Sequence, residues 1–123
     1  MTMKYMAVIG SRGYNNYEEF MNYINHYTQN LVAKDLTFVS GGASSGADAL
    51  IARFCKEHGL RIIEHKADWN KYGRSAGPRR NIDIVNRADM LLAFWDGESR
   101  GSKHSIDLAR KKGIPVKIVK IKI

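Results

Sequence analysis

The chain has 123 residues, 44% of them hydrophobic, and carries a net charge of +8 at pH 7. This length and composition predict a single domain over residues 1–123 with one core. No stretch is both apolar enough and long enough to span a membrane, so we expect no membrane partner. Because the N-terminus lacks a secretory signal and Cys55 is the single cysteine, we expect a cytoplasmic protein without disulfides.

The first predicted unit is a strand, a polar loop and a helix. The apolar run 5–9 is typical of a strand buried on both faces of a parallel sheet. It ends at Gly10, Ser11 and Arg12. Apolar side chains at helical spacing up to Leu31 then predict a helix, which Asn15 or Asn16 caps.

The second unit repeats this order around a glycine-rich loop. Residues 37–39 predict a strand, and apolar positions from Ala47 predict a helix that Gly59 ends. Between them, Gly41, Gly42 and Gly46 allow tight turns, and Ser44 caps the helix or donates to a ligand, with Ser45 as the alternative. An oxyanion suits such a helix start, although a turn without a ligand explains the isolated loop equally well.

The third and fourth strands are predicted at 60–65 and 88–94, with a helix between them. The helix begins at Gly77-Pro78, and we expect its inner face to carry Ile82 and Val85. The polar segment 66–77 fits no regular element, and its length suggests a lid over a site.

The last predicted elements are a short helix that ends at Gly113 and a strand over 116–123. Pro115 at the start of this strand is typical of an edge strand. The lysines of this strand point to one face before Ile118 and to the other face after Val119 if the strand is regular, and this change predicts a bulge between the two residues.

Five strands that alternate with helices predict an α/β fold, a three-layer Rossmann-like domain with a mostly parallel five-stranded sheet and helices on both faces. Ligands of such sheets bind at the carboxyl ends of the strands. The polar clusters after strands one, two and four therefore meet at one edge, with Ser99 in the last of them. Trp95 lies beside them and either stacks on a base or packs in the core.

Four of these motifs together resemble the YspA/YpsA-related branch of the SLOG superfamily. They are Gly10-Ser11-Arg12, Ser40-Gly41-Gly42 through Gly46-Ala47-Asp48, Gly77 through Asn81, and Trp95-Asp96-Gly97 leading to Ser99 through Ser102. The superfamily groups DprA/Smf proteins with the LOG phosphoribohydrolases on a Rossmann-like fold, in bacteria and phages. The resemblance implies nucleotide binding by Gly10, Ser11, Arg12, Gly41, Gly42, Gly46, Asp48, Arg79, Arg80, Asn81, Gly97, Gly101 and Ser102.

The chain departs from the LOG enzymes at their second glycine motif. There the LOG pattern places catalytic glutamates, whereas this chain has Lys103, His104 and Ser105. Glycosidic cleavage needs a carboxylate to stabilise an oxocarbenium-like state or to activate water. We therefore assign no catalytic residue, and Glu98 and Asp107 are the nearby carboxylates out of register.

The sequence favours a non-catalytic receptor that senses or sequesters a nucleotide or nucleotide-derived ligand. The second interpretation is a nucleotide hydrolase that cleaves an N-glycosidic or phosphoester bond. Single-stranded nucleic-acid binding ranks third: residues 61–123 hold fifteen Lys and Arg against seven Asp and Glu, but no aromatic track accompanies them. The four histidines lack metal-ligand spacing, so we expect no metal and no cofactor, and relatives suggest a homo-oligomer.

Overall fold

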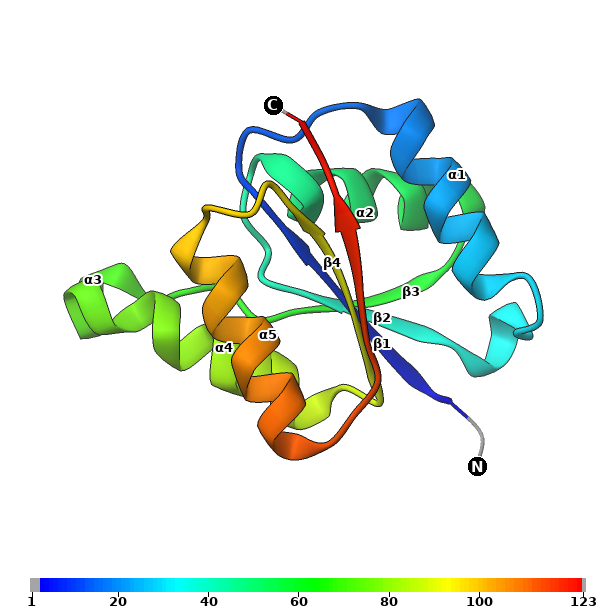
Figure 1. Ribbon diagram of the computed structural model, residues 1–123. Helices are drawn as coiled ribbons and strands as arrows, with labels where there is room; N and C mark the ends of the chain where they lie inside the picture. Colours follow the sequence, from blue (N-terminus) through cyan, green and yellow to red (C-terminus); the bar gives the residue numbers. More distant parts are fainter. Residues whose placement is uncertain (1–2, 123) are drawn as a thin grey trace.

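A computed structural model of the protein describes residues 3–122 (Figure 1). Strands alternate with helices along this chain, and two 3₁₀ turns, Ala33–Asp35 and Gly73–Ser75, complete it. The elements are β1 (Tyr5–Gly10), α1 (Tyr17–Thr28), β2 (Thr37–Ser40), α2 (Gly46–His58), β3 (Arg61–Glu64), α3 (Trp69–Tyr72), α4 (Ala76–Arg87), β4 (Met90–Trp95), α5 (Arg100–Lys112) and β5 (Val116–Lys120).

The five strands form one sheet in the order β3-β2-β1-β4-β5, and every pairing is parallel. This confirms the predicted α/β, Rossmann-like fold. Chain order reverses between the central neighbours β1 and β4, where Ala7 pairs with Leu91. The chain leaves β1 toward α1 on one face and β4 toward α5 on the other, which opens a crevice at the carboxyl ends of these strands.

Alternate residues of the central strands build a core on each face of the sheet. Met6 and Val8 pack against α1 and α2, in the cluster that contains Phe20 and Phe54. Ala7 and Ile9 point to the other face, toward α4 and α5. Both faces are therefore covered, as Figure 1 shows, and this explains the continuous apolar run of β1.

Polar caps fix where the helices begin. The side chain of Asn16 accepts the N–H of Glu19 at 3.1 Å and starts α1, as its sequence predicts. The unassigned segment 66–77 forms the single turn α3 and the turn Gly73–Ser75, and Asp68 caps α3 by accepting the N–H of Lys71.

Two local predictions are wrong. Ile82 does not face the core: its side chain is 42% exposed, because the buried face of α4 follows Asn81, Ile84 and Val85 at helical spacing. The strand β5 contains no bulge, since its residues pair continuously with Leu91–Trp95. The lysines and apolar residues of β5 do not alternate regularly because β5 is an edge strand that is not fully covered, and Ile118 is 38% exposed.

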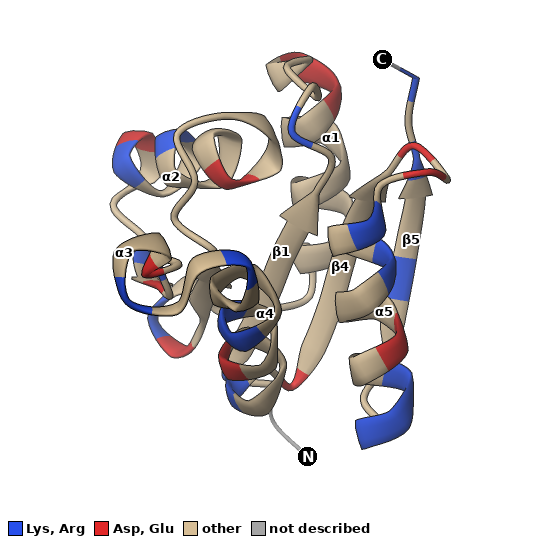
Figure 2. Ribbon diagram, turned by 90° about the vertical axis from the view of Figure 1, so that its left-hand side faces the viewer, with Lys and Arg blue, Asp and Glu red and all other residues tan. Residues whose placement is uncertain are grey.

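Lysine and arginine are distributed unevenly along the chain. In Figure 2 blue segments mark α4, α5 and β5, with others on α2 and α3, whereas the start of α1 is acidic. Within residues 3–122 no helix combines the length and the apolar character that crossing a bilayer requires.

Candidate functional site

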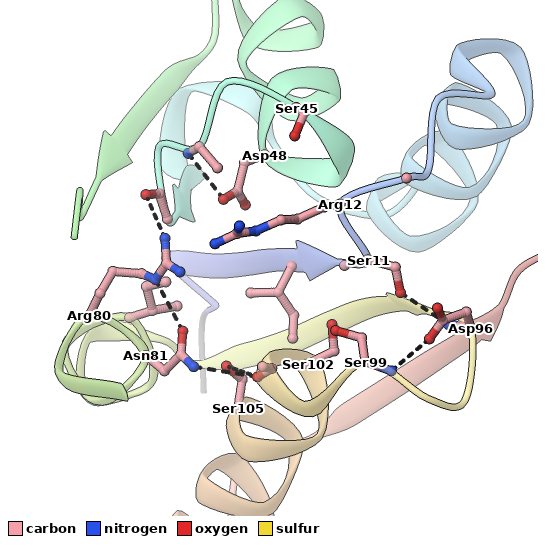
Figure 3. A pocket seen from close by; sticks show the side chains of 17 residues that line it. Ser11, Arg12, Ser45, Asp48, Arg80, Asn81, Asp96, Ser99, Ser102 and Ser105 are labelled. Carbon is pink, nitrogen blue, oxygen red and sulfur yellow. Dashed lines mark hydrogen bonds between the residues drawn. The ribbon is translucent and has the colours of Figure 1, made fainter. Parts of the chain in front are cut away.

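A pocket of about 350 Å³ opens at the carboxyl ends of β1, β2 and β4 (Figure 3). It lies where the order of strands reverses, the position expected for ligands in this class of sheet. The residues that line it are Ile9, Gly10, Ser11, Arg12, Gly13, Gly41, Ala43, Ser45, Asp48, Arg80, Asn81, Ile84, Asp96, Ser99, Gly101, Ser102 and Ser105.

The loop after β1 is tied to β4 and extends Arg12 over the pocket. The N–H of Ser11 donates to the carbonyl of Phe94 at 3.0 Å, and the hydroxyl of Ser11 accepts the N–H of Asp96 at 3.2 Å. Arg12 points into the pocket below Asp48 in Figure 3, and its side chain makes no hydrogen bond within residues 3–122. Its guanidinium is therefore available to a ligand.

The glycine loop before α2 uses its own N–H groups internally. The hydroxyl of Ser40 accepts the N–H of Gly42, and Oδ2 of Asp48 accepts the N–H of Ala43, both at 3.2 Å. Burial raises the pKa of Asp48, although the Ala43 N–H and the positive charge of Arg80 act in the opposite direction. This loop thus surrounds a carboxylate of its own chain.

Gly46 brings the start of α2 against the loop after β1. Its φ of +68° is a conformation that other residues rarely adopt. A Cβ there would lie 2.6 Å from the carbonyl oxygen of Ser11 and 2.8 Å from Cα of Arg12. Glycine is required at this position for close packing, and this packing holds the Arg12 backbone at the pocket rim.

From α4, Arg80 and Asn81 connect the two sides of the pocket. The guanidinium of Arg80 donates from Nη1 to the carbonyl of Gly41 at 3.1 Å and from Nε to Oδ1 of Asn81 at 3.2 Å. Asn81 in turn donates to the carbonyl of Gly101 at 3.4 Å. Burial lowers the pKa of Arg80, and the neighbouring Asp48 opposes this shift.

The turn between β4 and α5 is fixed by Asp96 and Trp95. Oδ1 of Asp96 accepts the N–H groups of Glu98 and Ser99, both at 2.9 Å, and these bonds hold the pKa of Asp96 below its ordinary value. The indole of Trp95 donates to the carbonyl of Ser99 at 3.0 Å. The turn therefore presents the first residues of α5 to the pocket.

The N-terminal turn of α5 carries small polar residues and no acidic side chain. Its first N–H groups have no acceptor within the helix, because an α-helix leaves these donors unpaired. Ser102 is only 5% exposed and lines the pocket, yet its hydroxyl has no hydrogen-bond partner in the described part of the chain. Ser105 donates to the carbonyl of Gly101 at 3.3 Å instead.

The family model described as "YspA, cpYpsA-related SLOG family" matches residues 5–72. The chain belongs to this family. A relative, the "Gene 61 protein" of Mycobacterium phage D29, is 41% identical over an alignment of 87 residues that covers 66% of this chain and 69% of the phage protein. Family membership confirms the resemblance that the four sequence motifs indicate.

Two solved structures share the fold of this SLOG-family chain. The molybdenum cofactor binding protein of Rippkaea orientalis has a TM-score of 0.71 and 19% sequence identity, over 99% of this chain and 79% of that chain. The Moco carrier protein of Chlamydomonas reinhardtii has a TM-score of 0.70 and 19% identity, over 98% of this chain and 78% of that chain. At this level of identity the similarity establishes the fold alone.

The structure brings most of the predicted site residues together. Those that line the pocket come from the end of β1, from the loops after β1, β2 and β4, and from the helices α2, α4 and α5. They are Gly10, Ser11, Arg12, Gly41, Asp48, Arg80, Asn81, Ser99, Gly101 and Ser102.

The other predicted residues do not line the pocket, and several have a different partner. Arg79 stacks its guanidinium 4.3 Å from the ring centre of Tyr72 and donates to Ser75. Trp95 packs in the core beside α4 and α5. Gly42, Ser44, Gly46 and Gly97 lie in turns or at the helix start outside the lining.

Sequence reasoning missed the lining residues Ile9, Gly13, Ala43, Ile84, Asp96 and Ser105 as site residues, and it named Ser45 only as the alternative to Ser44. Two signals were present in the sequence. Ser105 follows Ser102 by three residues and Gly101 by four, so it shares their helix face. On α4, Ile84 follows Asn81 by three residues and shares its helix face in the same way.

The carboxylates named as out-of-register candidates also lie outside the pocket lining. Glu98 is exposed, and Asp107 pairs with Lys103 at 2.9 Å. Cys55 is 2% exposed, and burial raises the pKa of its thiol to about 12, which makes it unreactive at neutral pH. Within residues 3–122 no group of three His, Cys, Asp or Glu side chains is arranged to hold a metal.

Proposed function

We propose that the pocket binds a nucleotide or nucleotide-derived ligand, with its phosphate at the N-terminus of α5. One observation carries this proposal: Ser102, only 5% exposed, lines the same pocket as Arg12 at a helix N-terminus, and its hydroxyl has no hydrogen-bond partner within residues 3–122. A helix N-terminus and an arginine each stabilise an oxyanion, and here both serve one cavity.

The physical chemistry of this end of the pocket suits a phosphate. The N–H groups of the first turn point at the anion, and the helix dipole adds a partial positive charge. Arg12 supplies a full positive charge from the opposite loop. Arg80 contributes a longer-range field, since its donors already bind Gly41 and Asn81.

The remainder of the pocket supports a small organic ligand. Ile9 and Ile84 are buried apolar residues in its lining, and they offer a surface for a flat heterocycle. The volume of about 350 Å³ falls within the usual range for small-molecule sites. One sheet with a core on each face also supports a single ligand-binding domain.

The molybdenum cofactor is a second candidate ligand. Two proteins with this fold are named as molybdenum cofactor binding or carrier proteins. Elemental analysis for molybdenum in the purified protein distinguishes this candidate from a nucleotide.

A nucleotide hydrolase is the alternative class of protein, and the pocket lining limits the carboxylates that could be catalytic in it. Asp48 and Asp96 are the carboxylates in the pocket lining, and Asp96 is engaged by two backbone N–H groups. Incubation of micromolar protein with AMP, GMP, CMP and UMP, followed by chromatography, tests this class. A receptor releases no free base, whereas turnover of ~1 per second or faster that is lost in Asp48→Asn indicates an enzyme.

Mass spectrometry of molecules released from natively purified protein tests the proposal itself. We expect a retained phosphorylated heterocyclic compound, and calorimetry with that compound should give saturable binding. If neither the retained molecules nor the four nucleotides bind, the proposed function is wrong.

A further inference from the structure

A phosphate bound at the start of α5 gives no binding role to one polar group of the pocket, the carboxylate of Asp48. It lies in the first turn of α2 and lines the cavity. Oδ2 accepts the N–H of Ala43 at 3.2 Å, the backbone N–H of Gly41 also approaches the carboxylate, and no side chain within residues 3–122 donates to it. A carboxylate can accept more hydrogen bonds than these, so this group can also accept one from a ligand.

The two helices that open into the pocket differ in charge. The first turn of α2 contains Asp48, whereas the first turn of α5 contains no acidic residue. A negative charge at Asp48 offsets the helix dipole of α2 and repels a second anion. Asp96 lies before α5 and not in its first turn, and its Oδ1 already accepts the N–H groups of Glu98 and Ser99. The pocket is therefore asymmetric in the first turns of its helices, with an anion-binding end at α5 and a hydrogen-bond-accepting end at α2.

We propose that Asp48 determines specificity by accepting hydrogen bonds from the ribose hydroxyls of a ribonucleotide and by excluding ligands that carry a second phosphate at the ribose. This inference rests on the proposed function, because it requires the first phosphate at α5. Carboxylates pair with ribose diols in other nucleotide-binding folds, for the same reason of donor and acceptor complementarity.

Arg80 lies near this acceptor. A Cβ on Gly41 would lie 2.7 Å from Nη1 of Arg80 and 2.9 Å from Oδ2 of Asp48, so both groups approach Cα of Gly41. Burial raises the pKa of Asp48, and the positive charge of Arg80 acts in the opposite direction, in favour of the ionised carboxylate, which is the better acceptor. At the other end the hydroxyl of Ser102, which has no hydrogen-bond partner within residues 3–122, is an independent sign that a polar ligand completes the pocket.

Calorimetry on the full-length protein tests this inference. The ligands are the best-binding of AMP, GMP, CMP and UMP, its 2′,3′-dideoxy analogue and its 3′,5′-bisphosphate. Wild-type protein should prefer the ribonucleotide over the dideoxy analogue by roughly 10- to 100-fold, the range of hydrogen bonds to a charged group. This ratio requires no variant, so it does not depend on the folding of a mutant.

The isosteric change Asp48→Asn should lower that ratio to roughly 3-fold or less and should improve binding of the bisphosphate. The matched control Asp107→Asn removes an exposed carboxylate outside the pocket and should leave both values unchanged. A wild-type ratio near one, or a ratio unaffected by Asp48→Asn, overturns this inference alone. Failure of all four ribonucleotides to bind wild-type protein overturns the proposed function, and this inference with it.

Discussion

The loops before α2 and α5 invite comparison, because each leads into a helix of 13 residues whose start lines the same pocket. The loop before α2 is rich in glycine, but it directs N–H groups to Ser40 and Asp48 of its own chain. In the loop before α5, Asp96 accepts the N–H groups that precede the helix. Both loops thus use N–H groups internally, and the difference lies in the first turns of the helices: that of α2 contains Asp48, whereas that of α5 contains no acidic residue.

The difference teaches that glycine content alone does not locate an anion site. Glycine allows the backbone to approach a ligand, but it equally allows an acidic side chain of the protein to occupy that place. What decides is where the N–H groups point and whether the helix start already carries a negative charge.

The largest expected effect comes from filling the anion-binding end. Ser102→Leu should weaken nucleotide binding on the order of 100-fold, because a leucine side chain would occupy the cavity beside the α5 N–H groups. Ser44→Leu is the matched control at the glycine loop, since Ser44 is exposed and outside the lining. Calorimetry measures both, and circular dichroism checks that the variants fold. Equal losses in the two variants would contradict the difference between the loops.

Removal of the unpaired arginine should have the next largest effect. Arg12→Ala should cost a nucleotide about 1.5–3 kcal/mol of binding free energy, the value of a charge-assisted hydrogen bond, and should spare the corresponding nucleoside. Arg79→Ala, next to the pocket but stacked on Tyr72, should change neither affinity. If Arg79→Ala weakens the nucleotide as much as Arg12→Ala does, the assignment of these arginines is wrong.

The packing of the two loops can be tested through stability. Gly46→Ala should lower the free energy of unfolding by about 1–3 kcal/mol, because φ is +68° and the new Cβ would meet the carbonyl of Ser11. Gly101→Ala is the control, since a Cβ there meets no atom within 4 Å. Urea denaturation gives both values, and an unchanged Gly46→Ala midpoint would exclude close packing at this position.

The smallest predicted effect concerns the pH dependence of folding stability, to which the two pocket carboxylates, Asp48 and Asp96, contribute with opposite signs. The pKa of Asp48 is raised in the folded protein, so the folded state binds this proton more tightly and stability falls as pH rises through the shifted pKa. The pKa of Asp96 is lowered, so its contribution is present above the ordinary pKa and disappears as pH falls through the lowered value.

At pH 7 Asp48→Asn should therefore raise the melting temperature, and Asp96→Asn should reduce it. Both differences should vanish in acid: that of Asp48→Asn once the pH is below the ordinary pKa, and that of Asp96→Asn only below the lowered pKa of Asp96. Thermal denaturation followed by circular dichroism across the acidic range checks this. Shifts of the same sign at pH 7 would mean that the two carboxylates have similar surroundings.

Most of the fold follows from sequence because its signals are local and strong. The apolar run of β1 and the cap at Asn16 depend on neighbouring residues, and the structure has β1 and the start of α1 where they are predicted, although α1 ends at Thr28 and not at Leu31. The errors at Ile82 and at β5 have tertiary causes. Which face of α4 meets the sheet, and how far the sheet covers Ile118, depend on packing between distant elements.

The site is less predictable than the fold, since its residues converge from four separate segments. The sequence identifies the arginines at 79 and 80 as equals, yet helical geometry turns one toward Gly41 and the other toward Tyr72. It also marks the glycine loop as the anion site, because nothing local reveals that Asp48 accepts a hydrogen bond from Ala43. Side-chain direction at the helix starts is the information that one sequence lacks.

Amide chemical shifts test the central claim most directly, which is that the phosphate lies at α5 and not at the glycine loop. Backbone ¹H–¹⁵N spectra of the ¹⁵N-labelled protein are recorded with the best-binding nucleoside monophosphate and with its nucleoside. The shift difference between the two ligands isolates the phosphate. We predict the largest differences at the amides of Gly101 and Ser102, where the unpaired N–H groups begin α5. Largest differences at Gly41, Gly42 and Ala43 would contradict the account.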